Sequence, residues 1–202
     1  MITIPIYDMI ILPDVTYYFK NEVLGDLGAQ DAKKGDRLLF LMLKEDKGRK
    51  DMSMSDFYPI GVTGTLETVD REGNVSVRTG ERVEVTDLQV TEEAILAQVC
   101  DKKVEQDLRE EEQQERFDNM RSALLRFIQG FQWGIWARSY VMHWKSMNEV
   151  VSALSGYLNL TDEERYAILA SDTVSERTER IERAVYEFME MAKVSEEAEN
   201  AQ

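Results

Sequence analysis

The sequence has a single cysteine, a single histidine and no long hydrophobic run. One cysteine cannot form an intramolecular disulfide, and Cys100 and His143 have no partners at the spacing of a zinc site. No apolar stretch approaches the roughly 18 residues of a membrane span. The N-terminal MITIPIYDMIILPD has no basic lead-in of the kind that opens a signal peptide. We therefore expect a cytoplasmic protein with no membrane contact, no metal and no cofactor.

Basic residues are also scarce. The chain has 39 acidic and 24 basic residues, a formal net charge of -15. Such a field repels phosphate backbones and anionic membranes, so nucleic-acid binding is not expected unless one face is locally basic. The same net charge favours polypeptides with basic segments, mainly through the rate of association.

Motifs of catalysis are absent as well. No G-x-x-x-x-G-K-[ST] phosphate loop occurs, so the sequence predicts no ATP site of that kind. Ser139 and Ser146 have His143 and Lys145 nearby in sequence, but such neighbours are common on helices. No catalytic residue is therefore assigned, and the chain is not expected to be an enzyme.

The first hundred residues are short segments rich in β-branched and aromatic residues. These segments are ITIPIY, VTYYF, RLLFLMLK, YPIGVTGTLETV, VSVRT, RVEVTDL and AILAQV. Because no long helix separates them, they predict a largely antiparallel, curled sheet or small barrel. We expect a hairpin turn at Arg71 to Asn74 with Gly73 at positive φ, a bulge between Val85 and Leu88, and a polar loop from Lys44 to Asp56.

The remaining residues have the periodicity of helices. Strong helix formers begin at Asp101, and the charged first half of this segment is expected to be a solvated connector. Glutamates three residues after Thr161 and Thr173 complete two capping boxes, which predict two further helix starts. The polar tail from Val194 is expected to fray.

These patterns predict an α+β fold class. We expect a curled antiparallel sheet or pseudo-barrel over residues 1–100, followed by a helical bundle over residues 101–202.

The stretch GFQWGIWARSYVMHW, residues 130–144, holds all three tryptophans. At 100° per residue, its large apolar side chains form two faces. Phe131, Ile135 and Met142 share one face, and Trp133, Trp136, Tyr140 and Trp144 share the other. One face suffices for a bundle core, so the second is either covered by the rest of the chain or binds a partner or substrate. Gly130 and Gly134 are able to break the helix, which would change these angles.

Two methionines in the polar loop offer a second candidate surface. Met52 and Met54 lie within DMSMSD. Their adaptable thioethers either contact varied unfolded chains or fold back onto the sheet. We name both, with Trp133, Trp136, Tyr140 and Trp144, as candidate substrate-binding residues.

Three segments together resemble a known family. IPIYDMIILPDVTYYF resembles the opening strands of the Lon protease N-terminal domain. YPIGVTGTLETVDREGNVSVRTGERVEVTDL is similar to its central strand pair, with Gly61 and Gly80 in the expected places. MNEVVSALSGYLNLTDEERYAILASDTVSERTERI resembles its C-terminal helices. The glycines of Asn21 to Asp36 and the tryptophans of residues 130–144 depart from the family pattern.

The resemblance implies a PUA-like domain that gathers unfolded or damaged protein substrates for an ATP-dependent serine protease. The implied partners are those substrates and the ATPase and protease modules of a longer chain, with homo-oligomers possible. Two alternatives stay open. One is a free-standing PUA-like adaptor or ligand-binding protein, which a reading frame ending at Gln202 would favour. The other is an RNA-binding protein, which the acidic balance opposes.

Overall fold

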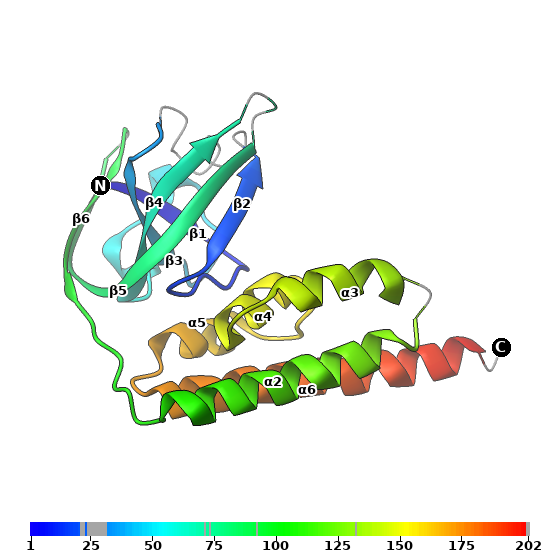
Figure 1. Cartoon of the computed structure of the whole chain (residues 1–202). Helices are drawn as coiled ribbons and strands as arrows, with labels where there is room; N and C mark the ends of the chain where they lie inside the picture. Colours follow the sequence, from blue (N-terminus) through cyan, green and yellow to red (C-terminus); the bar gives the residue numbers. More distant parts are fainter. Residues whose placement is uncertain are drawn as a thin grey trace. The chain divides into compact units, whose positions relative to one another are not determined.

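The computed structural model describes two compact units (Figure 1). Described residues are 1–20, 23, 32–70, 72, 74–91, 93–131 and 133–200, with side chains up to residue 194. The sheet unit comprises Met1–Lys103 and Thr161–Ala170, and the helical unit comprises Val104–Leu160 and Ser171–Gln202. Each unit is described by itself.

The sheet unit is built on a curled six-stranded sheet of the described residues (Figure 1). Its strands are β1 (Ile2–Ile6), β2 (Thr16–Lys20), β3 (Arg37–Met42), β4 (Ile60–Val69), β5 (Asn74–Val90) and β6 (Ile95–Asp101). The order is β1-β3-β4-β5-β2, and β6 pairs with β5. The predicted α+β fold class is confirmed. One pair differs from the expected antiparallel pattern, because β1 and β3 are parallel.

Strand β5 organises the sheet. The predicted strands VSVRT and RVEVTDL are one continuous strand, because β4 pairs along both halves. On the other side, β5 pairs first with β2 and then with β6. The predicted bulge is confirmed by a register shift between Val85 and Asp87. Beneath this half of β5 lies a buried apolar cluster: Leu39, Leu41, Leu43, Phe57, Val83, Val85, Leu88 and Ile95.

Two expectations fall partly on residues that the structure does not describe. At the predicted hairpin turn, the Asp70 carboxylate accepts hydrogen bonds from the backbone N–H groups of Glu72 and Asn74, both at 2.8 Å. Positions 71 and 73, including the predicted positive φ of Gly73, lie outside the described residues. So do positions 21, 22 and 24–31 of the glycine-containing segment Asn21 to Asp36.

Helix α5 (Asp162–Ala170) belongs to the sheet unit. Its capping box forms as predicted, since Thr161 and Glu164 exchange backbone-to-side-chain hydrogen bonds. The Tyr166 ring stacks on Tyr58 at 4.0 Å between centroids, and Arg165 forms an ion pair with Asp8 at 3.0 Å. The boundary expected from the sequence groups α5 with the other helices, whereas these contacts join it to the sheet.

The helical unit contains α2 (Glu110–Ile128), α3 (Gly134–His143), α4 (Met147–Leu154) and α6 (Val174–Asn200). Helices α2 and α6 run side by side (Figure 1), joined by an ion pair between Arg116 and Glu182. The core of this unit consists of buried apolar side chains from all four helices and the turn after α4. They include Phe117, Met120, Leu124, Phe127, Val141, Val150, Val151, Leu158, Ile181 and Val185.

Two predicted helix boundaries differ from the structure, namely the start of α2 and the end of α6. Helix α2 begins at Glu110 rather than near Asp101, because the preceding backbone pairs elsewhere. The Glu105 N–H donates to Asp172 O at 2.8 Å, and Val174 N–H donates to Glu105 O at 3.0 Å. At the other end, α6 continues to Asn200 instead of fraying from Val194. Its last residues are rich in Glu and Ala, which favour helix.

No helix in the described part of the chain is long and apolar enough to cross a membrane.

Candidate binding surface

Helix α3 starts at a glycine because no other residue fits there. A Cβ on Gly134 would lie 1.8 Å from the Ile128 carbonyl oxygen at the end of α2. The chain turns through Gly130 before α3 begins, so the glycines do break the helix. The inward stripe of α3 is made of small side chains, with Gly134 and Val141 buried and Ala137 half-buried.

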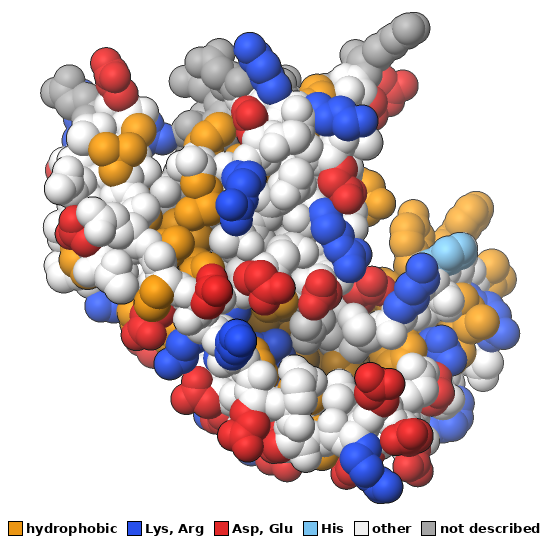
Figure 2. All heavy atoms as spheres, turned by 60° about the vertical axis from the view of Figure 1, so that its left-hand side comes forward, with side chains coloured by type: hydrophobic (Ala, Val, Ile, Leu, Met, Phe, Trp, Pro, Cys, Tyr) orange, Lys and Arg blue, Asp and Glu red, His pale blue; other side chains and the backbone are white. Residues whose placement is uncertain are grey.

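The large apolar side chains of α3 lie on either side of that stripe and are exposed. Their exposed fractions are 83% for Ile135, 78% for Trp136, 71% for Tyr140 and 51% for Met142. We call these four residues the α3 patch. Figure 2 shows apolar side chains gathered around the single histidine, at the right of the view. The expectation that Ile135 and Met142 face the core is wrong, because close approach to α2 selects the small residues instead.

The two remaining tryptophans are anchored at the ends of α3. Trp133 precedes the helix, is 49% exposed, and stacks on Phe131 with ring centroids 4.8 Å apart. Phe131 in turn contacts Phe127, also at 4.8 Å. Trp144 follows the helix and is half-buried. Of the four aromatic residues named from the sequence, only Trp136 and Tyr140 lie fully on the surface of α3, one turn apart.

Sequence reasoning missed the basic side chains beside the patch. Arg138 and Lys145 are exposed, and neither forms an ion pair with any described residue. Arg138 lies one turn from both Ile135 and Met142 on α3. The sequence did contain a signal, because no Asp or Glu occurs between Asp118 and Glu149.

His143 has a local structural contact on this surface. Its Nδ1 lies 2.6 Å from the Ser139 carbonyl oxygen, one turn earlier in α3. Because a carbonyl only accepts hydrogen bonds, Nδ1 carries the proton and donates. The ring therefore contacts the backbone of Ser139 rather than its hydroxyl, and this contact does not form a nucleophile and base pair.

The loop methionines lie in the sheet unit and have different environments. Two short 3-10 helices, η2 (Arg49–Asp51) and η3 (Met54–Asp56), order the loop. Met52 lies between them, half-buried, and packs against the apolar cluster beneath β5. Met54 begins η3 and is 47% exposed. Met52 therefore folds back onto the sheet, and Met54 is the methionine that faces solvent.

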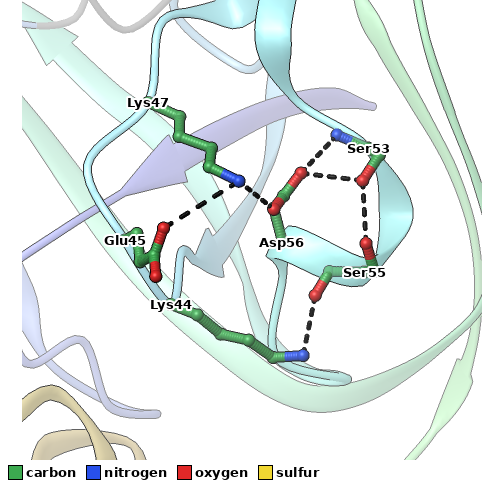
Figure 3. Close-up of polar contacts among 6 residues, drawn as sticks. All are labelled: Lys44, Glu45, Lys47, Ser53, Ser55 and Asp56. Atoms are coloured by element: carbon green, nitrogen blue, oxygen red, sulfur yellow. Dashed lines mark hydrogen bonds and ion pairs between the residues drawn. The ribbon is translucent and has the colours of Figure 1, made fainter.

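A network of polar contacts holds η3 in place (Figure 3). Asp56 lies at its centre: its Oδ1 is 2.5 Å from Lys47 Nζ, and its Oδ2 accepts from Ser53 N and Ser53 Oγ at 2.8 and 2.7 Å. Lys44 Nζ donates to the Ser55 carbonyl at 2.7 Å. The hydrogen bond from Lys47 and those from Ser53 lower the pKa of Asp56 from 3.8 to about 2.

Because the pKa of Asp56 is low, the stability of this loop decreases at strongly acidic pH. The stabilisation that ionised Asp56 provides is present above pH 3.8 and is lost as the pH falls through about 2. We expect its carboxyl carbon to titrate with a midpoint near 2 by NMR, and Lys47→Met to raise that midpoint. Lys50→Met, which removes a neighbouring charge outside the network, is the control. An unchanged midpoint in Lys47→Met would contradict the assigned cause.

The α3 patch and the η3 loop present different chemical groups to solvent. Among the described residues, no three His, Cys, Asp or Glu side chains are grouped to hold a metal ion. Exposed aromatic and aliphatic side chains of this extent on a folded domain are typical of interaction sites. The fold defines an α+β domain, and the α3 patch is its candidate interaction surface.

Residues 1–186 match the family described as the ATP-dependent protease La (LON) substrate-binding domain. The chain belongs to this family. It is 21% identical over 178 residues to the Lon protease of Clostridium beijerinckii, a match that covers 86% of this chain and 22% of that protein. The chain thus spans about a fifth of the length of that relative.

One solved structure supports the fold. The N-terminal domain of a Mycobacterium avium complex Lon protease is 18% identical, covers 93% of this chain and 96% of its own, and superposes with a TM-score of 0.58. The Lon N-terminal domain protein of Xanthomonas campestris is 15% identical, with 90% and 94% coverage and a TM-score of 0.45.

Proposed function

We propose that this chain recognises unfolded or damaged protein segments for a Lon-type ATP-dependent protease. In this proposal the α3 patch is the contact surface, and the chain itself neither hydrolyses ATP nor cleaves peptide bonds. The observation that carries the proposal is the exposure of Trp136 and Tyr140, one turn apart on a helix whose buried stripe is already occupied by small residues. Family membership supports the same role.

The expected strength of binding suits a domain that passes substrates onward. Fully burying a large apolar side chain is worth roughly 1.5 to 3 kcal/mol, so the four residues of the patch provide on the order of 6 to 12. Association itself costs an estimated 4 to 15 kcal/mol in lost freedom of motion. A single extended segment on this patch therefore binds weakly and leaves readily.

The remaining partners follow from the same proposal. ATPase and protease modules would receive the segment held on α3, in the cytoplasm, where a lone thiol such as Cys100 stays reduced. Exposed Met54 offers a second, smaller contact in the sheet unit, and homo-oligomers would present several α3 patches to one unfolded chain. Several weak contacts to one chain raise its overall affinity.

A double substitution tests the α3 patch. Trp136→Ala with Tyr140→Ala is expected to weaken binding of a reduced and alkylated, permanently unfolded protein by at least about tenfold, equivalent to ~1.4 kcal/mol or more. The thermal midpoint should change little, because both side chains are already in water. Fluorescence anisotropy and calorimetry measure the two quantities.

The control removes exposed aromatics outside α3. Tyr18 and Tyr157 are 79% and 72% exposed. Tyr18→Ala with Tyr157→Ala should leave binding unchanged. Equal losses of binding affinity in both double variants would show that any exposed aromatic side chain contributes. A large fall in melting temperature for the α3 variant would show that Trp136 and Tyr140 are part of the core.

A further inference from the structure

The sequence segment that contains the α3 patch has a net charge opposite in sign to that of the whole chain. The formal net charge is -15, yet Arg121, Arg126, Arg138 and Lys145 are the only charged residues between Asp118 and Glu149. Arg126, Arg138 and Lys145 are exposed. Figure 2 shows blue side chains next to the apolar side chains and the histidine at the right of the view.

The two acidic residues at the ends of this segment, Asp118 and Glu149, already interact with other groups. Asp118 forms an ion pair with Arg121 at 2.6 Å. Glu149 accepts a hydrogen bond from the Lys145 backbone N–H at 2.7 Å, at the start of α4. Neither carboxylate pairs with Arg138 or with the Lys145 ammonium, whose charges face solvent without a described partner.

We infer that the α3 patch selects apolar polypeptide segments flanked by acidic residues. The inference rests on the proposed function and narrows its substrate class. A bound segment places its apolar side chains on Ile135, Trp136, Tyr140 and Met142, and its flanking carboxylates meet Arg138 and Lys145. The net charge alone predicts the reverse preference, for basic segments. Contacts in the bound state depend on charges within a Debye length, about 8 Å at physiological ionic strength. The local basic residues therefore determine the charge preference of the bound segment.

A polypeptide segment fits this surface better than a membrane or a nucleic acid. Anionic bilayers and duplexes present many charges over a wide area, so they meet the repulsive field of the whole acidic chain. A short segment carries only a few charges and meets mainly the field of α3. Two exposed basic side chains, Arg138 and Lys145, are enough to pair with such flanks.

Matched peptides test the charge preference on the full chain. Three labelled peptides share one core of Leu, Phe and Trp and carry pairs of Glu, Lys or Ser at both ends. At physiological salt we expect the Glu-flanked peptide to bind about five- to tenfold more tightly than the Lys-flanked one, as two exposed charge contacts allow. Raising the salt to about 0.5 M should remove most of this difference.

Substitutions then locate the preference. Arg138→Gln with Lys145→Gln should abolish the advantage of the Glu-flanked peptide while the Ser-flanked peptide still binds. Arg183→Gln with Lys193→Gln removes two exposed basic residues of α6 for the same change in net charge, and should preserve the advantage. Retained preference in the first variant, or its loss in both, overturns the assignment to α3.

The remaining outcomes separate this inference from the proposed function. Equal binding of Glu- and Lys-flanked peptides, weakened by Trp136→Ala with Tyr140→Ala, overturns the charge preference and leaves the proposed function standing. Failure of all three peptides to bind contradicts the proposed function itself. Vesicles of anionic phospholipid serve as the competing ligand. If they bind more tightly than the Glu-flanked peptide, the patch is a membrane surface and the inference is overturned.

Discussion

Gly134→Ala is expected to destabilise the helical unit by about 3 kcal/mol, the upper end of the usual cost of overpacking. The added Cβ would lie 1.8 Å from Ile128 O and 2.8 Å from Ile128 C. These are backbone atoms, so no change of side-chain rotamer relieves the collision. Relief requires α3 to move away from the end of α2, which uncovers Val141. Chemical denaturation measures the loss.

The matched control is Gly156→Ala in the same unit. A Cβ on Gly156 meets nothing within 4 Å, and its φ is not positive. The same chemical change should therefore alter stability by less than about 0.5 kcal/mol, as for other surface substitutions. Similar losses in the two variants would mean that α3 adjusts without cost and that close packing does not fix its orientation.

Arg82→Met is expected to release α5 from the sheet unit. Arg82 is 2% exposed, and its guanidinium donates to three backbone carbonyls: Lys102 O at 3.1 Å, Lys103 O at 2.8 Å and Leu169 O at 3.0 Å. Hydrogen bonds from a charged group contribute about 1.5 to 3 kcal/mol each, and their loss leaves the carbonyls without this donor. We expect a cost of roughly 3 kcal/mol or more.

Hydrogen exchange distinguishes this effect from general destabilisation. Amides of α5 should lose protection first in Arg82→Met, while those of α2 and α6 retain theirs. Arg78→Met is the control on the same strand. The Arg78 side chain is half-exposed and forms a long ion pair of 3.9 Å with Asp14, so its loss should change hydrogen exchange little, because an exposed ion pair contributes little to stability. Unchanged protection of α5 in Arg82→Met would contradict the role assigned to this arginine.

Local signals predicted most elements of the fold. Short runs of β-branched and aromatic residues located the strands, and the capping boxes at Thr161 and Thr173 correctly placed the starts of α5 and α6. The sequence predicted a solvated connector before α2 but placed it within a helical segment, so its non-helical backbone was not predicted. Its residues favour helix, but Glu105 pairs with the backbone near Thr173, almost seventy positions later in the sequence. A propensity calculated along the chain contains no information about such a partner.

The sequence also predicted part of the candidate binding surface and missed the rest. Helical periodicity grouped Trp136 with Tyr140, and a scan of charge along the sequence would have marked the segment between Asp118 and Glu149 as basic. Periodicity also grouped Ile135 and Met142 on the face expected to supply the bundle core, because it contains no information about which face packs closest. In the structure the closest face is the one with the smallest side chains, since Gly134 allows α3 to approach the backbone of α2.

By itself, the sequence determined the fold class, most strands and helix starts, and the family resemblance, because these depend on residue type and spacing over short ranges. Tertiary structure decided that α5 joins the sheet through Arg82, Arg165 and Tyr166, and that both large apolar faces of α3 are exposed. These outcomes depend on which backbones approach closely and on where buried donors find acceptors. Such conditions exist only once distant segments are packed together.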